Sequence, residues 1–187
     1  MKFQSLLPFL LLATLTPSAF AQDAKKDAAP KTVLGPSAAL LESWNDIGRK
    51  LTAMAEDFPE DKYDFKATPA QRSFAEQLLH AAGANYYFIN AAKGLKPPAG
   101  DPKRADYKTR ADVVAFVKKS FAEGADLITQ RGDKGMDEVM PDVGAEHLYH
   151  FGDLAWGFVE HLGEHYGQLV VYYRLAGLVP PESRPKK

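Results

Sequence analysis

The sequence predicts an all-α protein folded as a four-helix bundle, and two observations support this prediction. Proline is costly inside a helix, and the chain leaves four long windows without it, at residues 37–58, 70–96, 103–140 and 142–179. In each window apolar residues recur at spacings of three and four, and no alternating, strand-like run of any length separates the windows. Four amphipathic helices in one domain bury their apolar faces best as a bundle.

The first two helices are expected to begin at recognisable capping residues. Ser37 occupies the position where an N-cap belongs for the first helix. The second helix is expected to open with Thr68-Pro69-Ala70-Gln71, which reads as a capping box with proline at the first helical position, and to close at Gly94. The first core stripe comprises Leu40, Trp44, Ile47, Leu51, Met54 and Phe58, and the second comprises Phe74, Leu78, Ala81, Asn85 and Phe88.

The last two helices have similar signals. The third is expected to start at Thr109, with Asp112 three residues on, and to stop at Gly132. The fourth is expected to run from about Glu146 to Gly177, after which Pro180-Pro181 ends it. Their apolar stripes comprise Val113, Val117, Phe121 and Ile128 in the third helix, and Phe151, Leu154, Phe158, Leu162, Leu169 and Tyr172 in the fourth.

The domain is expected to span residues 37–182, followed by a short tail at 183–187. Its connections at 95–108 and 133–145 are longer than a tight bundle needs, so they either cover one end of the bundle or cross over. Residues 22–36 are rich in alanine, lysine, aspartate and proline without a sustained period, which predicts a disordered linker.

Residues 1–21 resemble a secretory signal peptide. Lys2 precedes an apolar run from Leu6 to Leu15, and the segment ends in Ala19-Phe20-Ala21, the small-x-small pattern that signal peptidase cleaves. The run is too short for a permanent transmembrane helix. We therefore expect an exported protein, periplasmic or extracellular, with no stable membrane insertion after cleavage.

The composition excludes several classes of function. Lys plus Arg number 23 and Asp plus Glu number 24, so a basic nucleic-acid-binding footprint is absent from the sequence. The chain has no cysteine, which excludes a thiol nucleophile, a thiolate metal site and a disulfide scaffold. Any chemistry must come from histidine, carboxylate, amide and hydroxyl groups.

Three of the five histidines are candidate metal ligands. His161 and His165 are four residues apart, so both imidazoles lie on the apolar face of the fourth helix. His80 lies near the middle of the second helix, at a level that can meet them across the bundle core. Three neutral imidazoles around one divalent ion would leave an open coordination position for water or substrate. The alternative is that these histidines form ordinary core hydrogen bonds. His147 and His150 lie too far along the chain to join the same ion and are expected at an entrance or on the surface.

The segment His161-Leu162-Gly163-Glu164-His165 also fits the H-x-x-E-H motif of inverted zinc proteases. That chemistry needs an acidic third ligand downstream, and Glu182 is the sole carboxylate side chain after His165. Because Glu182 lies beyond the proline pair that ends the helix, the motif does not favour a protease. Glu164 and Gln168 are candidates for handling protons or orienting groups.

Three segments in order resemble the DinB-like family. The stretch from His161 through Gln168 to Pro181 resembles its last helix, and the stretch from Gln71 to His80, followed by Asn85, resembles its second. Trp44, the Asp57-Phe58-Pro59 turn and Tyr63-Asp64-Phe65 are similar to its first helix and the turn after it. The resemblance implies an up-up-down-down bundle, often dimeric, in which His80, His161 and His165 hold a divalent ion, nickel or zinc before iron or manganese.

The resemblance does not fix a reaction, and several functions stay open. A metal-dependent enzyme could activate water for hydrolysis of an unknown small molecule. Relatives that transfer thiols suggest an S-transferase instead, although export weakens that alternative, because a cytoplasmic thiol would be scarce outside the cell. A bundle that binds a metal or small ligand without turnover, its histidines and Asn85 forming a polar pocket, is a further alternative. So is a structural protein with Tyr86, Tyr87, Tyr172 and Tyr173 at a homodimer interface.

Overall fold

The computed structural model describes residues 32–185 and confirms the predicted fold class. Its four long helices are α1 (Pro36–Asp57), α2 (Phe74–Ala92), α3 (Arg110–Gly135) and α4 (Phe151–Leu175). Short 3-10 turns lie at Glu60–Lys62, Arg104–Asp106 and Pro181–Ser183. Within residues 32–185 there is no β-strand, only two isolated bridges. The expected signal peptide, and the linker up to residue 31, lie outside the described residues.

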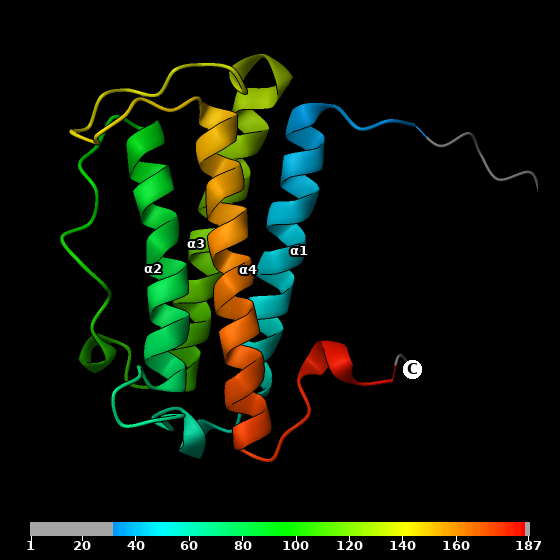
Figure 1. Ribbon diagram of the computed structural model, residues 1–187, viewed down its shortest axis with the longest axis vertical. Helices are drawn as coiled ribbons and strands as arrows, with labels where there is room; N and C mark the ends of the chain where they lie inside the picture. The colour runs from blue at the N-terminus through cyan, green and yellow to red at the C-terminus, as the bar shows by residue number, and fades with distance from the viewer. Residues whose placement is uncertain (1–31, 186–187) are drawn as a thin grey trace, which may run out of the picture. The chain divides into compact units, whose positions relative to one another are not determined.

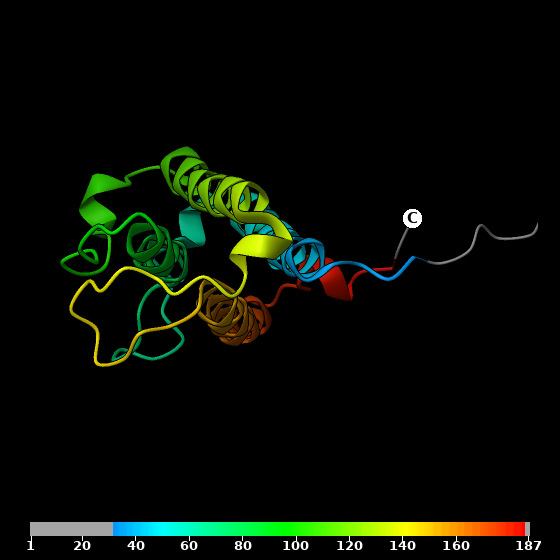
Figure 2. The ribbon, with the colours of Figure 1, turned by 90° about the horizontal axis from the view of Figure 1, so that it is seen from above.

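The helices form a four-sided bundle in which α1 and α2 lie on one diagonal and α3 and α4 on the other (Figures 1 and 2). Figure 1 shows α1 and α4 running downward and α2 and α3 running upward. The chain order is thus down-up-up-down, not the up-up-down-down order that the family resemblance implied. The reason is the connection between α2 and α3, which runs the length of the bundle beside α2 and returns the chain to the end where α2 began.

The two long connections were expected either to cross over or to cover one end of the bundle, and each does one of these. The segment between α2 and α3 is the crossover, and the segment between α3 and α4 passes over the upper end of the bundle (Figure 1). Residues on either side of this upper loop pair with each other. Met140 N–H donates to the Tyr149 carbonyl at 2.9 Å, and Phe151 N–H donates to the Glu138 carbonyl at 2.9 Å.

The closest helix pair is α1 with α3, and Trp44 lies at its centre. The indole ring is fully buried, with the rings of Phe88 and Phe121 each 5.6 Å away between centroids. Its N–H donates to the Phe121 carbonyl at 2.9 Å, which satisfies the one polar atom of the side chain. Gly124 permits this approach, since a Cβ there would overlap the indole ring. Every member of the predicted α1 stripe is buried.

The start of α1 differs from the prediction. Gly35 is the N-cap, Pro36 is the first helical residue, and Ser37 lies inside the first turn. Asp133, from the end of α3, accepts hydrogen bonds from the Ser37 backbone N–H at 2.9 Å and from its hydroxyl at 2.6 Å. The cap of α1 is therefore supplied by a distant carboxylate, which local sequence does not reveal.

The start of α2 was also predicted wrongly. Thr68–Gln71 forms a turn, and the capping box is made by Ser73 and Glu76 instead. The preceding segment bends back on the helix start, where Phe74 N–H donates to the Phe65 carbonyl and Ala75 N–H to the Tyr63 carbonyl, each at 2.9 Å. These bonds, made with residues eight or more positions away, hold 68–72 outside the helix.

The remaining helix ends are a mixture of confirmed and corrected predictions. The capping box of Thr109 and Asp112 is present, and helical geometry breaks at Gly132, where φ is 57°. Gly177, with φ of 77°, follows the end of α4 as expected. However, α4 begins at Phe151 and not near Glu146, because the residues before it belong to the paired upper loop.

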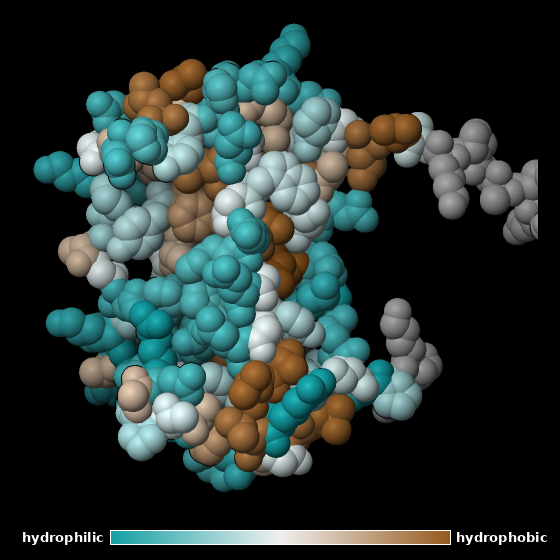
Figure 3. Space-filling view, in the orientation of Figure 1, coloured by the Kyte–Doolittle hydropathy of each residue, from teal (hydrophilic) through white to brown (hydrophobic). Residues whose placement is uncertain are grey.

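Polar side chains cover most of the face in Figure 3, and apolar ones gather at its lower end, where α4 finishes. Val171, Leu175 and Val179 are each more than half exposed there. Among the described residues, no helix combines the length and apolarity needed to cross a membrane.

The packing of Trp44 generates a stability prediction. Gly124→Ala should lower the free energy of unfolding by about 1–3 kcal/mol, because the added methyl group displaces a fully buried ring. Urea unfolding followed by circular dichroism measures the change. Gly163→Ala on α4 is the matched control, since no atom lies within 4 Å of a Cβ there. The control should be neutral or stabilised by up to about 1 kcal/mol; equal losses in both variants would contradict the packing argument.

Candidate metal centre

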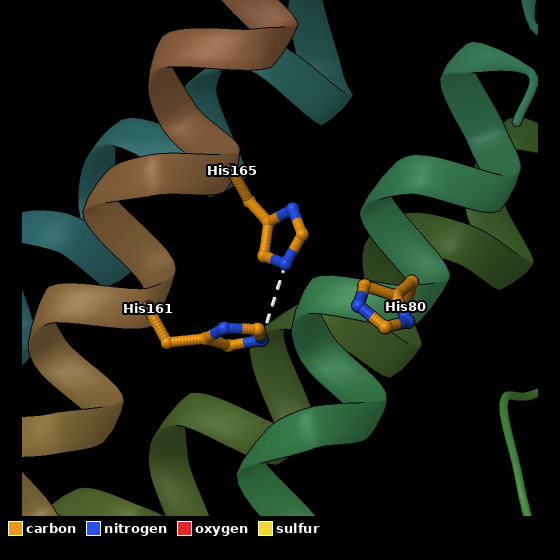
Figure 4. A group of neighbouring side chains, drawn as sticks. All are labelled: His80, His161 and His165. Atoms are coloured by element: carbon orange, nitrogen blue, oxygen red, sulfur yellow. Dashed lines mark hydrogen bonds between the residues drawn. The ribbon is translucent and has the colours of Figure 1, made fainter. Parts of the chain in front are cut away.

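The three predicted histidines meet between α2 and α4 (Figure 4). One ring nitrogen from each of His80, His161 and His165 lies within 4.8 Å of the other two. The Nε2 atoms of His161 and His165 are 3.1 Å apart, one helical turn from each other on α4. His80 faces them from α2, with its ring centroid 4.7 Å from that of His165 and 5.8 Å from that of His161. Because α2 and α4 are neighbours in the bundle, residues far apart in sequence form one cluster.

The surroundings favour the neutral form of the two α4 histidines. His165 is only 6% exposed, and burial, together with the neighbouring His161 and His80, lowers its pKa to about 4. Burial and His80 also lower the pKa of His161. At neutral pH both rings therefore keep a nitrogen lone pair, which is the form that binds a metal ion.

His80 is oriented by a carboxylate from the crossover connection. Its Nδ1 lies 2.8 Å from Asp101 Oδ1, and the other oxygen of Asp101 accepts from Arg72 Nη2 at 3.0 Å. Burial alone would raise the pKa of the Asp101 carboxyl, but these bonds to His80 and Arg72 lower it overall. An ionised Asp101 fixes the His80 proton on Nδ1 and leaves the lone pair on Nε2.

His165 has amide partners on its far side. Its Nδ1 lies 2.5 Å from the Gln77 amide nitrogen and 3.3 Å from Gln168 Oε1, and the two glutamines are hydrogen-bonded to each other. The Gln77 amide nitrogen donates and therefore pairs with an Nδ1 lone pair, whereas Gln168 Oε1 accepts and pairs with an Nδ1 proton. With its proton on Nδ1 the ring uses the Gln168 contact, and Nε2 is then the acceptor that faces the cluster.

The donor set fits a divalent ion. Two imidazole nitrogens that bind one tetrahedral zinc ion at about 2.0–2.1 Å stand roughly 3.3 Å apart. The Nε2 atoms of His161 and His165, at 3.1 Å, are close to that spacing. His80 and His165 each have an outer hydrogen-bond partner on Nδ1, as is usual for histidine ligands of metals. Three imidazoles also leave room for a further ligand.

An open cleft of about 480 Å³ reaches two of the three histidines. His80 and His161 form its polar end, with Asp101 and Asp153 at its margins. The rest is largely apolar, formed by Ala84, Tyr87, Tyr149, Leu154, Gly157 and Phe158. A small molecule can therefore approach the histidine cluster from solvent.

The other polar residues considered in the sequence analysis lie beside the histidine cluster or away from it. Glu164 is exposed, with Oε2 3.9 Å from His161 Nδ1. His147 and His150 are exposed on and beside the upper loop, as predicted, and His147 lines a hollow that adjoins the cleft. Asn85 does not join the histidines. It is fully buried and donates to Ser120 Oγ on α3 at 3.0 Å, so the predicted polar pocket does not include it.

The sequence reasoning missed Gln77 and Asp101. Gln77 lies three residues before His80 on the same face of α2, so helical spacing could have found it. Asp101 lies in the crossover, and no local pattern marks it, because only the path of that segment brings it to His80.

Comparisons with known proteins agree with the four-helix fold. The family model described as DinB superfamily matches residues 44–169, a range that includes all three histidines. A crystal structure of a DinB-like protein from Bacillus cereus ATCC 10987 matches with a TM-score of 0.61 at 18% identity, over 76% of this chain and 93% of that chain. At this identity the likeness shows a shared fold. No curated protein matches the sequence. The family match covers well over half of the sequence, and the chain therefore belongs to the DinB superfamily.

Proposed function

We propose that this protein binds one divalent metal ion through His80, His161 and His165 and acts as a metal-dependent hydrolase on a small molecule. The observation that carries the proposal is the convergence of three imidazole nitrogens within 4.8 Å at the end of an open cleft. Nickel or zinc is the ion we expect first, because imidazole suits both, with iron or manganese as alternatives.

A bound divalent ion would supply a Lewis-acid centre that polarises water or a carbonyl group at neutral pH. The protein's own residues prepare the site for it. Asp101 holds the proton of His80 on Nδ1, and Gln168 Oε1 would accept the corresponding proton of His165 when Nε2 binds the ion. Each contact turns an Nε2 lone pair toward the cluster. Glu164 lies 3.9 Å from Nδ1 of His161, where its charge can act on a proton at that nitrogen, and it stays a candidate for handling protons.

Hydrolysis is favoured over thiol transfer by the expected location of the protein. If residues 1–21 are removed during export, the protein acts in the periplasm or outside the cell, where water is abundant and a cytoplasmic thiol is scarce. The cleft supports a small-molecule substrate, since it opens to solvent beside His80 and His161. The homodimer implied by the resemblance stays a prediction, and the exposed apolar end of α4 is the surface we assign to it.

Metal content is the first test. Protein purified without an affinity tag should contain about one divalent ion per chain by mass spectrometry, because the site provides a single set of three ligands. His80→Ala and His161→Ala should each lose it, whereas His147→Ala, an exposed histidine outside the cluster, should keep it. Chelation should lower the melting temperature, since an ion at 100 times its Kd stabilises a fold by about 2.7 kcal/mol. A wild-type protein that stays metal-free after reconstitution would overturn the proposal.

The role of Asp101 gives a second prediction. Asp101→Asn should weaken metal affinity about 10- to 100-fold with little change in fold, because the amide no longer fixes the His80 proton on Nδ1. Competition with a chromophoric chelator measures the affinity. Asp106→Asn, an exposed aspartate five residues further along the same connection, is the control and should bind metal like the wild type. Equal affinity in all three proteins would exclude a positioning role for Asp101.

A further inference from the structure

The cleft at the histidine cluster continues into a second hollow under the upper loop. This hollow has a volume of about 270 Å³. Four residues line both spaces: Tyr87, Tyr149, Leu154 and Phe158. The two spaces therefore adjoin along these four residues; two of the three histidines line the first, and the lining of the second is largely apolar.

Three aromatic rings stand where the two spaces meet, and they come from three different elements. Tyr87 belongs to α2, Phe158 to α4 and Tyr149 to the upper loop. Tyr87 and Tyr149 are 38% and 43% exposed, so their rings remain available to a ligand. Aromatic faces attract organic cations, with a free energy of about 0.5–2 kcal/mol for a well-placed ring.

The charged groups around this site are negative. The carboxylates of Asp101 and Asp153 border the cleft, and that of Asp142 borders the second hollow. Among the described residues that line either space, none is lysine or arginine. Asp101 is paired with Arg72 and His80, whereas the side chain of Asp153 has one polar contact within residues 32–185, with the ring of His150 at 3.3 Å. The lining side chains of the two spaces thus include carboxylates and no lysine or arginine, and Asp153 is the carboxylate best placed to attract a cation.

Gly157 keeps the cleft open. It lies in the interior of α4, where glycine costs about 0.5–1 kcal/mol relative to alanine. Nothing lies within 4 Å of a Cβ built at this position, so packing against the rest of the protein does not require glycine there. A large side chain at this position would project into the cleft.

We propose that the site binds an organic cation, with its ammonium group among Tyr87, Tyr149 and Phe158 and the rest of the molecule directed toward the histidines. The orientation of the ligand toward the histidines rests on the proposed function, since the ligand would be the substrate of the hydrolase or resemble it. Binding of the cation itself depends only on the aromatic rings and Asp153.

Three probes of similar size and different charge test the inference. Choline is the cation, 3,3-dimethylbutan-1-ol is its neutral isostere, and 3,3-dimethylbutanoate is the anion. We expect choline to bind about tenfold more tightly than the alcohol, and the anion to bind most weakly at the aromatic site. Titrations followed by NMR, with metal-free protein prepared by chelation and with metal-loaded protein, measure the three dissociation constants. Equal or tighter binding of the alcohol to the metal-free protein would overturn the inference.

Variants locate the site. Gly157→Leu should abolish choline binding, whereas Gly163→Leu, also at an open helical glycine of α4 but outside the cleft, should retain it. Tyr87→Leu and Asp153→Asn should each weaken binding about three- to tenfold, and Asp126→Asn on α3 should not. Circular dichroism confirms that each variant is folded. Unchanged binding in folded Gly157→Leu would exclude this cleft.

The two proposals fail separately. Choline binding by a protein that never takes up metal would remove the metal site and keep the cation site. Metal binding without a preference for choline would keep the metal site and remove the cation site.

Discussion

The Nε2 atoms of His161 and His165 lie 3.1 Å apart. At this distance two lone pairs would face each other, so a proton or a metal ion must lie between the two nitrogens. This constraint shapes the whole interface between α2 and α4. Imidazole rings in an otherwise apolar bundle need partners on both nitrogens, because an unpaired buried polar group costs about 1–3 kcal/mol. Gln77, as a donor, or Gln168, as an acceptor, can meet that need at Nδ1 of His165, and Asp101 meets it at His80. The inner nitrogens are left facing one another. A divalent ion satisfies all of them at once, whereas a single shared proton satisfies only one pair.

The topology of the bundle makes this arrangement available. Since the crossover between α2 and α3 runs the length of the bundle, it passes along the outer side of α2, at the level of His80 (Figure 1). Asp101 can then reach a histidine on α2 from a segment that is neither helix nor core. Arg72, just before the start of α2, holds the second oxygen of the same carboxylate. A short turn between antiparallel neighbours would have left His80 without this partner. The long connection therefore serves the site as well as the parallel arrangement of α2 and α3.

The helical spacing of residues predicted the features of the fold and the site that depend on that spacing. The α1 stripe and the pair His161–His165 follow from spacing along one helix, and His80 follows from its level on another. The errors lie where distant residues decide local structure. Asp133 caps α1 from the end of α3, and the bonds made by Phe65 hold the predicted start of α2 in a turn. Asp101 was not predicted for the same reason, because only the tertiary fold brings it to His80. A local signal gives no information about a partner that arrives through the tertiary fold, and polar partners of a buried site are commonly of that kind.

The cleft shows where the bundle gives up stability for access to the histidines. Gly157 weakens α4 at a position where alanine would fit without any clash, and Tyr87 keeps a large part of its ring in water. Neither feature helps the core, which is already closed around Trp44 on the opposite side of the bundle. Both widen or line the path to His80 and His161. A purely structural bundle would gain from filling this space. Leaving it open, with aromatic walls and carboxylates at its margins, is consistent with a site that admits a ligand to the histidine cluster.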